Sequence, residues 1–226
     1  MKTYKETVGD LSFYVRSDSD LEVCKEVVER KCYERKRLGF GIRENETWLD
    51  CGANIGAFAV WAETRFHAKV IGYEACEENT ILATANLELN QCRSTVTTAF
   101  ISGRTGGKTS VNFNERTPAR SSPTCKGMQR YVSNVSLAEE IDRLKPDGLK
   151  IDIEGGEFEL LDSGIPLDGI RAVALEYHFR FDKSCVKARK RIGPLIEYFP
   201  NHSIPKTIFS EDAWPAWQDA ILLFWK

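Results

Sequence analysis

The 226-residue sequence has no long apolar run, no excess charge of one sign and no closely paired cysteines. A helix needs about 20 consecutive apolar residues to cross a bilayer, and no segment approaches that length. With 31 basic and 33 acidic residues the net charge is -2, which excludes a generally basic nucleic-acid binder. We therefore expect a soluble, cytoplasmic protein without a membrane span, for which nucleic acid is not the favoured partner.

The seven cysteines are scattered and odd in number, and no two are spaced as Cys-x-x-Cys. This pattern argues against both a zinc cluster and a disulfide framework. Hydrophobic residues make up 42% of the chain, which is long enough for one well-packed domain and too short for two. We expect a single domain over residues 1–226, with an N-terminal hairpin and helix extension over residues 1–45 and a catalytic core over residues 46–226.

Two elements are expected in the N-terminal extension. Residues 3–16 alternate in polarity around Gly9-Asp10, which predicts a short β-hairpin. Ser19 and Glu22 have the spacing of a capping box, and apolar residues then recur at helical spacing as far as Cys32. We expect this helix to precede the first core strand and to help close a ligand site.

The stretch from Thr47 to Glu74 predicts a complete strand, glycine turn, helix and second strand. Glycines in such a turn let the backbone approach a ligand closely. Gly52 and Gly56 are spaced Gly-x-x-x-Gly, which matches neither the dinucleotide-binding pattern nor a P-loop. The turn is therefore not expected to bind a pyrophosphate or triphosphate group. Glu74 ends the second strand, where a carboxylate can accept two hydrogen bonds from a ribose diol. An adenosine ligand without phosphate fits these features best.

Strands and helices alternate through the rest of the chain. The patterns predict helices over residues 77–90, 136–144 and 182–198 and one beginning at 157, with strands over 94–100, 109–113, 149–153, 172–177, 203–208 and 219–225. This alternation indicates an α/β protein with a mainly parallel sheet and helices on both faces. The last two strands, joined without a helix, indicate an antiparallel edge.

Three motifs resemble a known enzyme family. The sequence DCGANIG at residues 50–56 resembles the first motif of class I S-adenosylmethionine-dependent methyltransferases. The sequence LKIDIEGGEFELL at residues 149–161 resembles the signature of the FkbM family of methyltransferases, and Glu-Tyr-His at residues 176–178 is similar to that family's pattern. The resemblance implies a Rossmann-like class I fold, with a seven-stranded sheet in the order 3-2-1-4-5-7-6 and strand 7 antiparallel. It also implies S-adenosyl-L-methionine as the cofactor.

The resemblance assigns the cofactor-binding residues to the first motif and the strand after it. Asp50 is expected to hold the turn and, directly or through water, the amino-acid end of the cofactor. Gly52, Asn54 and Gly56 are expected to line its approach, and Glu74 to bind the ribose hydroxyls. The glycines could instead serve the turn alone, and Asn54 could simply stabilise a left-handed backbone.

The second motif and the Glu-Tyr-His pattern supply the candidate catalytic residues. In open α/β sheets ligands bind beyond the carboxyl ends of the strands, so both motifs should face one cleft. Methylation of a hydroxyl requires loss of its proton, and a positioned carboxylate or imidazole contributes about 10²–10⁴-fold. Asp152, Glu154 and His178 are the candidates. A divalent metal held by these three and Glu176 is a less favoured alternative, and Glu157 could simply complement a helix dipole.

The acceptor is less well defined by the sequence. Basic residues gather in residues 102–133 and 180–191, where they could border an acceptor entrance and recruit an anionic molecule, or form a solvated helix face and loop. The resemblance implies an O-methyltransferase acting on a hydroxyl of a sugar or glycosylated small molecule. An RNA or other nucleic-acid methyltransferase and a non-catalytic S-adenosylmethionine-binding module are the alternatives.

Overall fold

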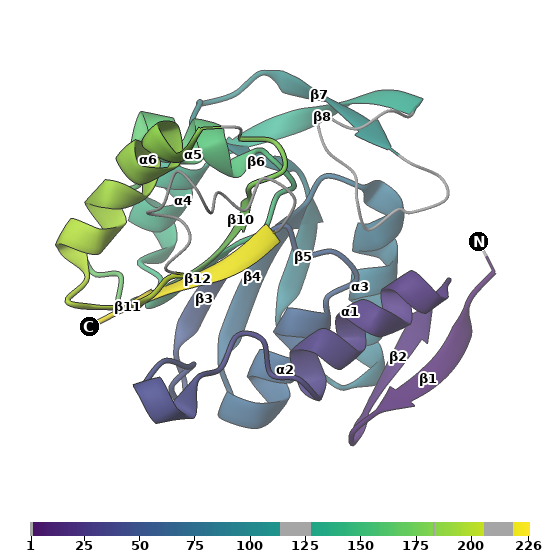
Figure 1. The fold of residues 1–226 in the computed structure, drawn as a ribbon. Helices are drawn as coiled ribbons and strands as arrows, with labels where there is room; N and C mark the ends of the chain where they lie inside the picture. The colour runs from purple at the N-terminus through teal and green to yellow at the C-terminus, as the bar shows by residue number, and fades with distance from the viewer. Residues whose placement is uncertain (1, 114–127, 183, 206–218) are drawn as a thin grey trace.

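The computed structural model describes residues 2–113, 128–182, 184–205 and 219–226. They form a seven-stranded sheet with helices on both faces, a smaller three-stranded sheet, and an N-terminal hairpin followed by a helix (Figure 1). The predicted loop at residues 116–127 and the predicted strand end at residues 206–208 lie outside the described residues. Among the described helices, none is long and apolar enough to cross a bilayer.

The large sheet has the predicted topology. Its strands are β3 (Thr47–Cys51), β4 (Lys69–Glu74), β5 (Thr95–Thr98), β9 (Gly148–Ile151), β10 (Ala172–His178), β11 (Asn201–Ser203) and β12 (Asp219–Trp225). They lie in the order β11-β12-β10-β9-β3-β4-β5, which is 3-2-1-4-5-7-6 read from the other edge. Strand β12 is antiparallel to both of its neighbours, as predicted. Because β3 and β9 are adjacent, the two sequence motifs leave the sheet side by side.

Two hydrophobic clusters pack on opposite faces of this sheet. The helices are α2 (Ala57–Phe66), α3 (Glu77–Leu89), α4 (Leu137–Leu144), α5 (Glu157–Ser163) and α6 (Cys185–Tyr198). Side chains of α2 and α3 share one cluster with Trp48, whereas those of α4, α5 and α6 share the other with Leu49. Successive residues of a strand point to opposite faces, so β3 contributes alternately to both clusters.

The N-terminal hairpin and helix are present, but the helix begins differently from the prediction. Strands β1 (Tyr4–Val8) and β2 (Leu11–Val15) turn at Gly9, and helix α1 follows over Asp18–Val28. The prediction that Ser19 caps this helix was wrong, because the cap is Ser17, whose hydroxyl accepts a hydrogen bond from Asp20 N at 3.3 Å. Arg16 fixes that start, since its backbone N–H and its Nε both donate to the Asp20 carboxylate, at 2.9 and 2.8 Å.

The strand predicted over residues 94–100 is divided between two sheets. Ala99 N donates to Glu74 O at 2.9 Å, and beyond it the chain leaves the large sheet. Strand β6 (Phe100–Ser102) instead pairs with β8 (Met128–Ser136), which also pairs with β7 (Lys108–Phe113). We did not predict β8, because residues 102–133 read as a largely irregular segment. A short 3-10 helix over Lys36–Leu38 was also not predicted.

The hairpin is tied to the core through Asn86 of α3 and Asn90, the residue that caps the end of this helix. Asn86 is fully buried, accepts from Tyr14 N at 2.6 Å, and donates to Tyr14 O at 3.2 Å and Ile55 O at 2.9 Å. Asn90 makes the same kind of pair with Ser12, at 3.3 and 2.7 Å. The two side-chain amides bond the backbone N–H and C=O groups of β2 as a neighbouring strand would, and so fix the position of β2 against α3.

We predict that Asn86→Ala lowers the free energy of unfolding by about 3 kcal/mol, because it leaves several buried backbone groups without partners. Glu88→Ala is the matched control, since Glu88 is exposed on the same helix and should change stability by less than about 0.5 kcal/mol. Urea denaturation of both variants is the measurement. Equal effects would show that Asn86 does not anchor the hairpin.

Candidate active site

A cavity of about 700 Å³ lies at the carboxyl ends of β3, β4, β9 and β10. The turn after β3 and the end of β4 line one side, and residues following β9 and near the end of β10 line the other. Helix α1 and the turn after it complete the wall. The cavity is therefore at the switch point of the sheet, where ligands of such folds bind.

Gly52 brings the two sequence motifs into contact. Its φ is +90°, and a Cβ added there would lie 1.7 Å from the backbone oxygen of Asp152. The N–H groups of Gly52 and Ala53 both donate to Tyr73 O, at 2.9 and 3.0 Å, so the turn is fixed against β4 as well. A residue with a side chain cannot occupy this position without moving the end of β9.

Asp50 lies beneath the turn in a buried ion pair. Its Oδ1 is 2.8 Å from Lys150 Nζ, which also donates to Gly52 O at 2.9 Å and lies 3.8 Å from Asp152 Oδ2. Burial disfavours charge on both groups, yet the carboxylates of Asp50 and Asp152 raise the pKa of Lys150 well above its usual value. Burial also raises the pKa of Asp50, and the charge of Lys150 opposes that shift.

The predicted residues of the first motif occupy different positions relative to the cavity. Gly52, Asn54 and Glu74 line it, whereas Asp50 and Gly56 do not. Gly56 begins α2 with a left-handed backbone, φ +80°, and packs closely against α3. Lys150 also lines the cavity and was missed by sequence reasoning. The available signal was a single cation within an otherwise apolar buried strand.

Glu74 and Asn54 are connected to each other. One oxygen of Glu74 accepts from Asn54 N at 2.8 Å, and the other accepts from Cys76 N at 2.9 Å. Burial raises the pKa of Glu74, although these backbone donors act in the opposite direction. Asn54 has a left-handed backbone, with φ of +50°, as expected if the residue stabilises the turn. Its buried Oδ1 has no hydrogen-bond partner in the described structure.

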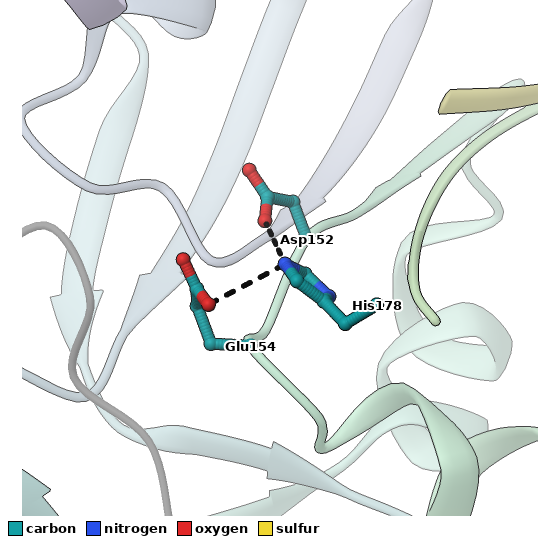
Figure 2. Close-up of side chains that lie close together, drawn as sticks. All are labelled: Asp152, Glu154 and His178. Atoms are coloured by element: carbon teal, nitrogen blue, oxygen red, sulfur yellow. Dashed lines mark ion pairs between the residues drawn. The ribbon is translucent and has the colours of Figure 1, made fainter. Parts of the chain in front are cut away.

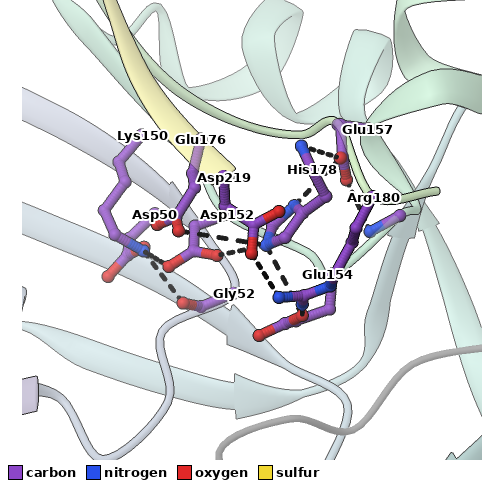
Figure 3. A network of polar contacts seen from close by, with 11 residues as sticks. Asp50, Gly52, Lys150, Asp152, Glu154, Glu157, Glu176, His178, Arg180 and Asp219 are labelled. Carbon is purple, nitrogen blue, oxygen red and sulfur yellow. Dashed lines mark hydrogen bonds and ion pairs between the residues drawn. The ribbon is translucent and has the colours of Figure 1, made fainter. Parts of the chain in front are cut away.

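His178 lies among four carboxylates, which are drawn in Figure 3; two of them, Asp152 and Glu154, are shown with it in Figure 2. Its Nε2 is 3.4 Å from Glu154 Oε2, 3.9 Å from Asp152 Oδ1 and 4.0 Å from Glu176 Oε1. Its Nδ1 is 2.9 Å from Glu157 Oε1, which also accepts from His178 N at 3.0 Å. Glu157 is fully buried, so it fixes the imidazole in addition to lying at the start of α5.

This arrangement shifts the pKa values of the cluster. Burial opposes a charged imidazole, but the hydrogen bond to Glu157 and the surrounding carboxylates outweigh it and raise the pKa of His178 to about 10. The negative charge of Asp152, with burial, raises the pKa of Glu176 to about 8. Burial also raises the pKa of Glu154. His178 is therefore a cation near neutral pH, and it does not line the cavity.

Arg180 supplies a second cation to the cluster. It forms ion pairs with Glu154 and with Asp219 (Figure 3). Asp219 lies directly opposite His178 in the antiparallel pairing of β10 with β12, although the two are far apart in sequence. Sequence reasoning missed Asp219, because nothing local to residue 219 indicates which strand residue it faces.

The candidate metal ligands fall into two overlapping groups. Ligand atoms of Asp152, Glu154 and His178 lie within 4.8 Å of one another, and so do those of Glu176, His178 and Asp219. The four residues predicted from the sequence are thus close together but do not form a single four-ligand group. His178 and Arg180 both lie within ion-pair distance of Glu154 in this cluster.

Comparison with known proteins identifies a matching family and solved structures with a similar fold. The model of the "Methyltransferase FkbM domain" matches residues 50–203. A search of curated proteins found no match. A structure of SMU.776, assigned as a methyltransferase and complexed with SAH, has a TM-score of 0.51 and 11% identity, covering 98% of this chain and 56% of that one. A protein assigned as a SAM-dependent methyltransferase from Streptococcus mutans has a TM-score of 0.50 and 11% identity, covering 98% and 54%.

The chain thus spans little more than half the length of those two solved structures. At such low identity the likeness concerns the fold alone. Together with the sheet order, it confirms the predicted Rossmann-like class I methyltransferase fold.

We predict that Gly52→Ala destabilises the protein by several kcal/mol and abolishes ligand binding, because the new Cβ overlaps the Asp152 carbonyl. Gly106→Ala is the control, since Gly106 also has positive φ, +68°, but has nothing within 4 Å of its added Cβ. It should cost only about 1 kcal/mol of backbone strain. Thermal unfolding distinguishes the two, and equal losses would show that strain rather than overlap explains Gly52.

We predict that the free energy of unfolding falls as the pH rises from about 6.5 to about 10. His178 has its ordinary pKa of 6.5 in the unfolded chain and about 10 when folded. Its contribution is therefore complete below pH 6.5 and is lost as the pH passes through the folded-state value. Glu157→Gln should lower the pKa of His178 and flatten this dependence. Titration of the imidazole by NMR, with denaturation across the same range, is the measurement; a wild-type pKa near 6.5 would contradict it.

Proposed function

The chain belongs to the FkbM family of methyltransferases, and on that premise we propose that it methylates a hydroxyl of a sugar or glycosylated small molecule. Its methyl donor is S-adenosylmethionine, which supplies an electrophilic methyl group on a sulfonium when bound. One observation carries the O-methylation proposal: the carboxylates of Asp152 and Glu154 face the cavity beside the Gly52 turn, with a fixed cation behind them.

The residues of the first motif fit the cofactor. Gly52 lines the cavity and has no side chain, so a ligand can approach its backbone closely. The buried Oδ1 of Asn54 has no protein partner in the described structure. We propose that Glu74 binds the ribose hydroxyls with the lone pairs that its two backbone donors leave free. Asp50 acts through Lys150, which fixes the Gly52 carbonyl; any water-mediated contact from Asp50 to the cofactor stays a prediction.

Among the three candidate bases, Asp152 is the best placed. His178 is protonated near neutral pH and lies behind the cavity wall, so we propose that it positions the carboxylates rather than accepting the proton. Glu154 is paired with Arg180 and lies 3.4 Å from His178 Nε2. Asp152 is the more exposed carboxylate, with 26% of its side chain accessible. We propose that its carboxylate accepts the hydroxyl proton as the methyl group is transferred.

The charges around the cavity favour a neutral acceptor. Its described lining includes seven carboxylates and four cations, as follows: Glu22, Glu26, Glu74, Asp152, Glu154, Glu176 and Asp219, with Arg30, Arg35, Lys150 and Arg180. This balance suits a cationic sulfonium and an uncharged polyhydroxylated acceptor, because carboxylates readily accept hydrogen bonds from hydroxyls.

The basic residues that suggested an anionic acceptor are largely paired or not described. Arg104 pairs with Glu159, and Arg191 pairs with Asp162 and Asp182. Four others, Arg116, Arg120, Lys126 and Lys183, lie outside the described residues. The described basic residues therefore give no support to an anionic acceptor.

We predict that Asp152→Asn lowers kcat by about 10²–10⁴-fold while changing the affinity for S-adenosylhomocysteine by only a few-fold. Asp142→Asn makes the same chemical change at an exposed residue of α4 and should leave both unchanged. Turnover and calorimetric titration of the two variants are the measurements. Full activity of Asp152→Asn would exclude it as the base.

A screen for S-adenosylhomocysteine release tests the acceptor class directly. We expect turnover with neutral sugars or glycosylated compounds, and weaker or no turnover with nucleotide sugars and RNA. Activity on RNA alone would overturn the proposed acceptor. Cofactor binding without turnover on any acceptor would instead support a binding module.

A further inference from the structure

Tyr33, in the turn between α1 and the 3-10 helix, lines the cavity although it is only 5% exposed. Its ring packs edge-to-face on Phe58, with centroids 5.3 Å apart, and its centroid is 5.6 Å from Lys150 Nζ. Within the described structure its hydroxyl makes no hydrogen bond. The side chain is almost fully buried, but its hydroxyl oxygen is not one of the buried polar atoms that lack a partner, so the hydroxyl is accessible to a ligand in the cavity.

The hydroxyl is available as a donor. Burial, followed by the negative charges of Asp152 and Glu176, raises the pKa of Tyr33 well above its usual value. The phenol therefore keeps its proton at any physiological pH. The nearby cations are already engaged, since Lys150 binds Asp50 and Gly52 O, and Arg180 binds Glu154 and Asp219.

The position of Tyr33 indicates which part of a ligand it meets. Its charged neighbours, Lys150, Asp152 and Glu176, belong to β9 and β10 or follow β9, whereas Glu74 ends β4 on the other side of β3. If Glu74 binds the ribose, as proposed above, the nucleoside lies on the β4 side. The sulfur and the amino-acid end then extend across Gly52 toward β9.

We propose that the Tyr33 hydroxyl hydrogen-bonds the amino-acid end of S-adenosylmethionine, so that the N-terminal extension forms part of the cofactor site. The phenol donates to the ligand carboxylate, and the carboxylates of Asp152 and Glu176 near the ring suit the ammonium group at the same end of the ligand. Tyr33 lies outside residues 50–203, which the family match covers, so this contact is not implied by the match. The inference depends on the proposed placement of the nucleoside at Glu74.

Two ligands that differ at one end test this role. S-adenosylhomocysteine carries the amino-acid end, whereas 5′-methylthioadenosine keeps the nucleoside and sulfur but lacks it. By calorimetry, Tyr33→Phe should weaken binding of S-adenosylhomocysteine by about ten-fold, the loss of one hydrogen bond to a charged group. Its affinity for 5′-methylthioadenosine should stay within about two-fold of wild type, because that ligand cannot reach the hydroxyl.

The controls separate this role from a structural one. Phenylalanine keeps the ring and its packing on Phe58, so the midpoint of thermal unfolding should not change. Tyr4→Phe, at a partly exposed position of β1 outside the cavity lining, should leave both affinities unchanged. An equal loss for both ligands would place Tyr33 at the nucleoside and overturn the proposal.

Unchanged affinity of Tyr33→Phe for both ligands would also overturn the proposal. If the KM for the acceptor rose at the same time, Tyr33 would contact the acceptor and not the cofactor. The cofactor site itself is tested by the wild-type protein. Failure of the wild type to bind S-adenosylhomocysteine would overturn the placement of the cofactor and this inference together. Normal wild-type binding with an unaffected Tyr33→Phe would overturn only the role of Tyr33.

Discussion

The buried ion pair between Lys150 and Asp50 is the interaction on which the rest of the site depends. Removing two charges from water is costly, and the cost is offset only when geometry and additional hydrogen bonds are good. Here the ammonium also binds the Gly52 carbonyl and approaches Asp152, so one side chain joins β3, the glycine turn and the end of β9. The lack of a side chain at Gly52 lets these elements approach closely enough for that link to form. Lys150 thus adds a side-chain link between the two motifs, which the pairing of β3 with β9 already places side by side.

A second buried pair, Glu157 with His178, organises the opposite side of the cavity. A histidine at a strand end suggested a general base, yet its environment makes it a cation. Asp152, Glu154 and Glu176 would repel one another strongly in isolation, because charges about 4 Å apart interact by about 4 kcal/mol at an effective dielectric near 20. His178 and Arg180 reduce that repulsion and allow several carboxylates to face one small space. The site is therefore an arrangement of compensated charges rather than a single reactive group.

Local patterns were sufficient to predict the alternation of strands and helices and the glycine turn, because each depends on neighbouring residues, whereas the sheet order was implied by the resemblance to the FkbM family. The pairing of Asp219 with His178 depends on the register of strands far apart in sequence, which no local pattern contains. Strand β8 was missed for a similar reason, since the bend at Ala99 moves β6 into another sheet. Tyr33 gave no signal, because it follows a helix in a segment without a motif. The extent of the domain and the roles of the site residues stay predictions.

The attachment of the first hairpin to α3 by Asn86 and Asn90 has a consequence for how such enzymes diversify. The residues proposed for the chemistry follow Thr47, while one wall of the chamber comes from an N-terminal prefix, the hairpin and α1, which shares a hydrophobic cluster with α2 and α3 and is fixed by the two asparagine amides. Substitutions in that prefix can reshape the chamber without disturbing the reacting groups. Substitutions there that keep Tyr33 are therefore a route to new selectivity, in a part of the chain that lies outside the residues matched by the family model.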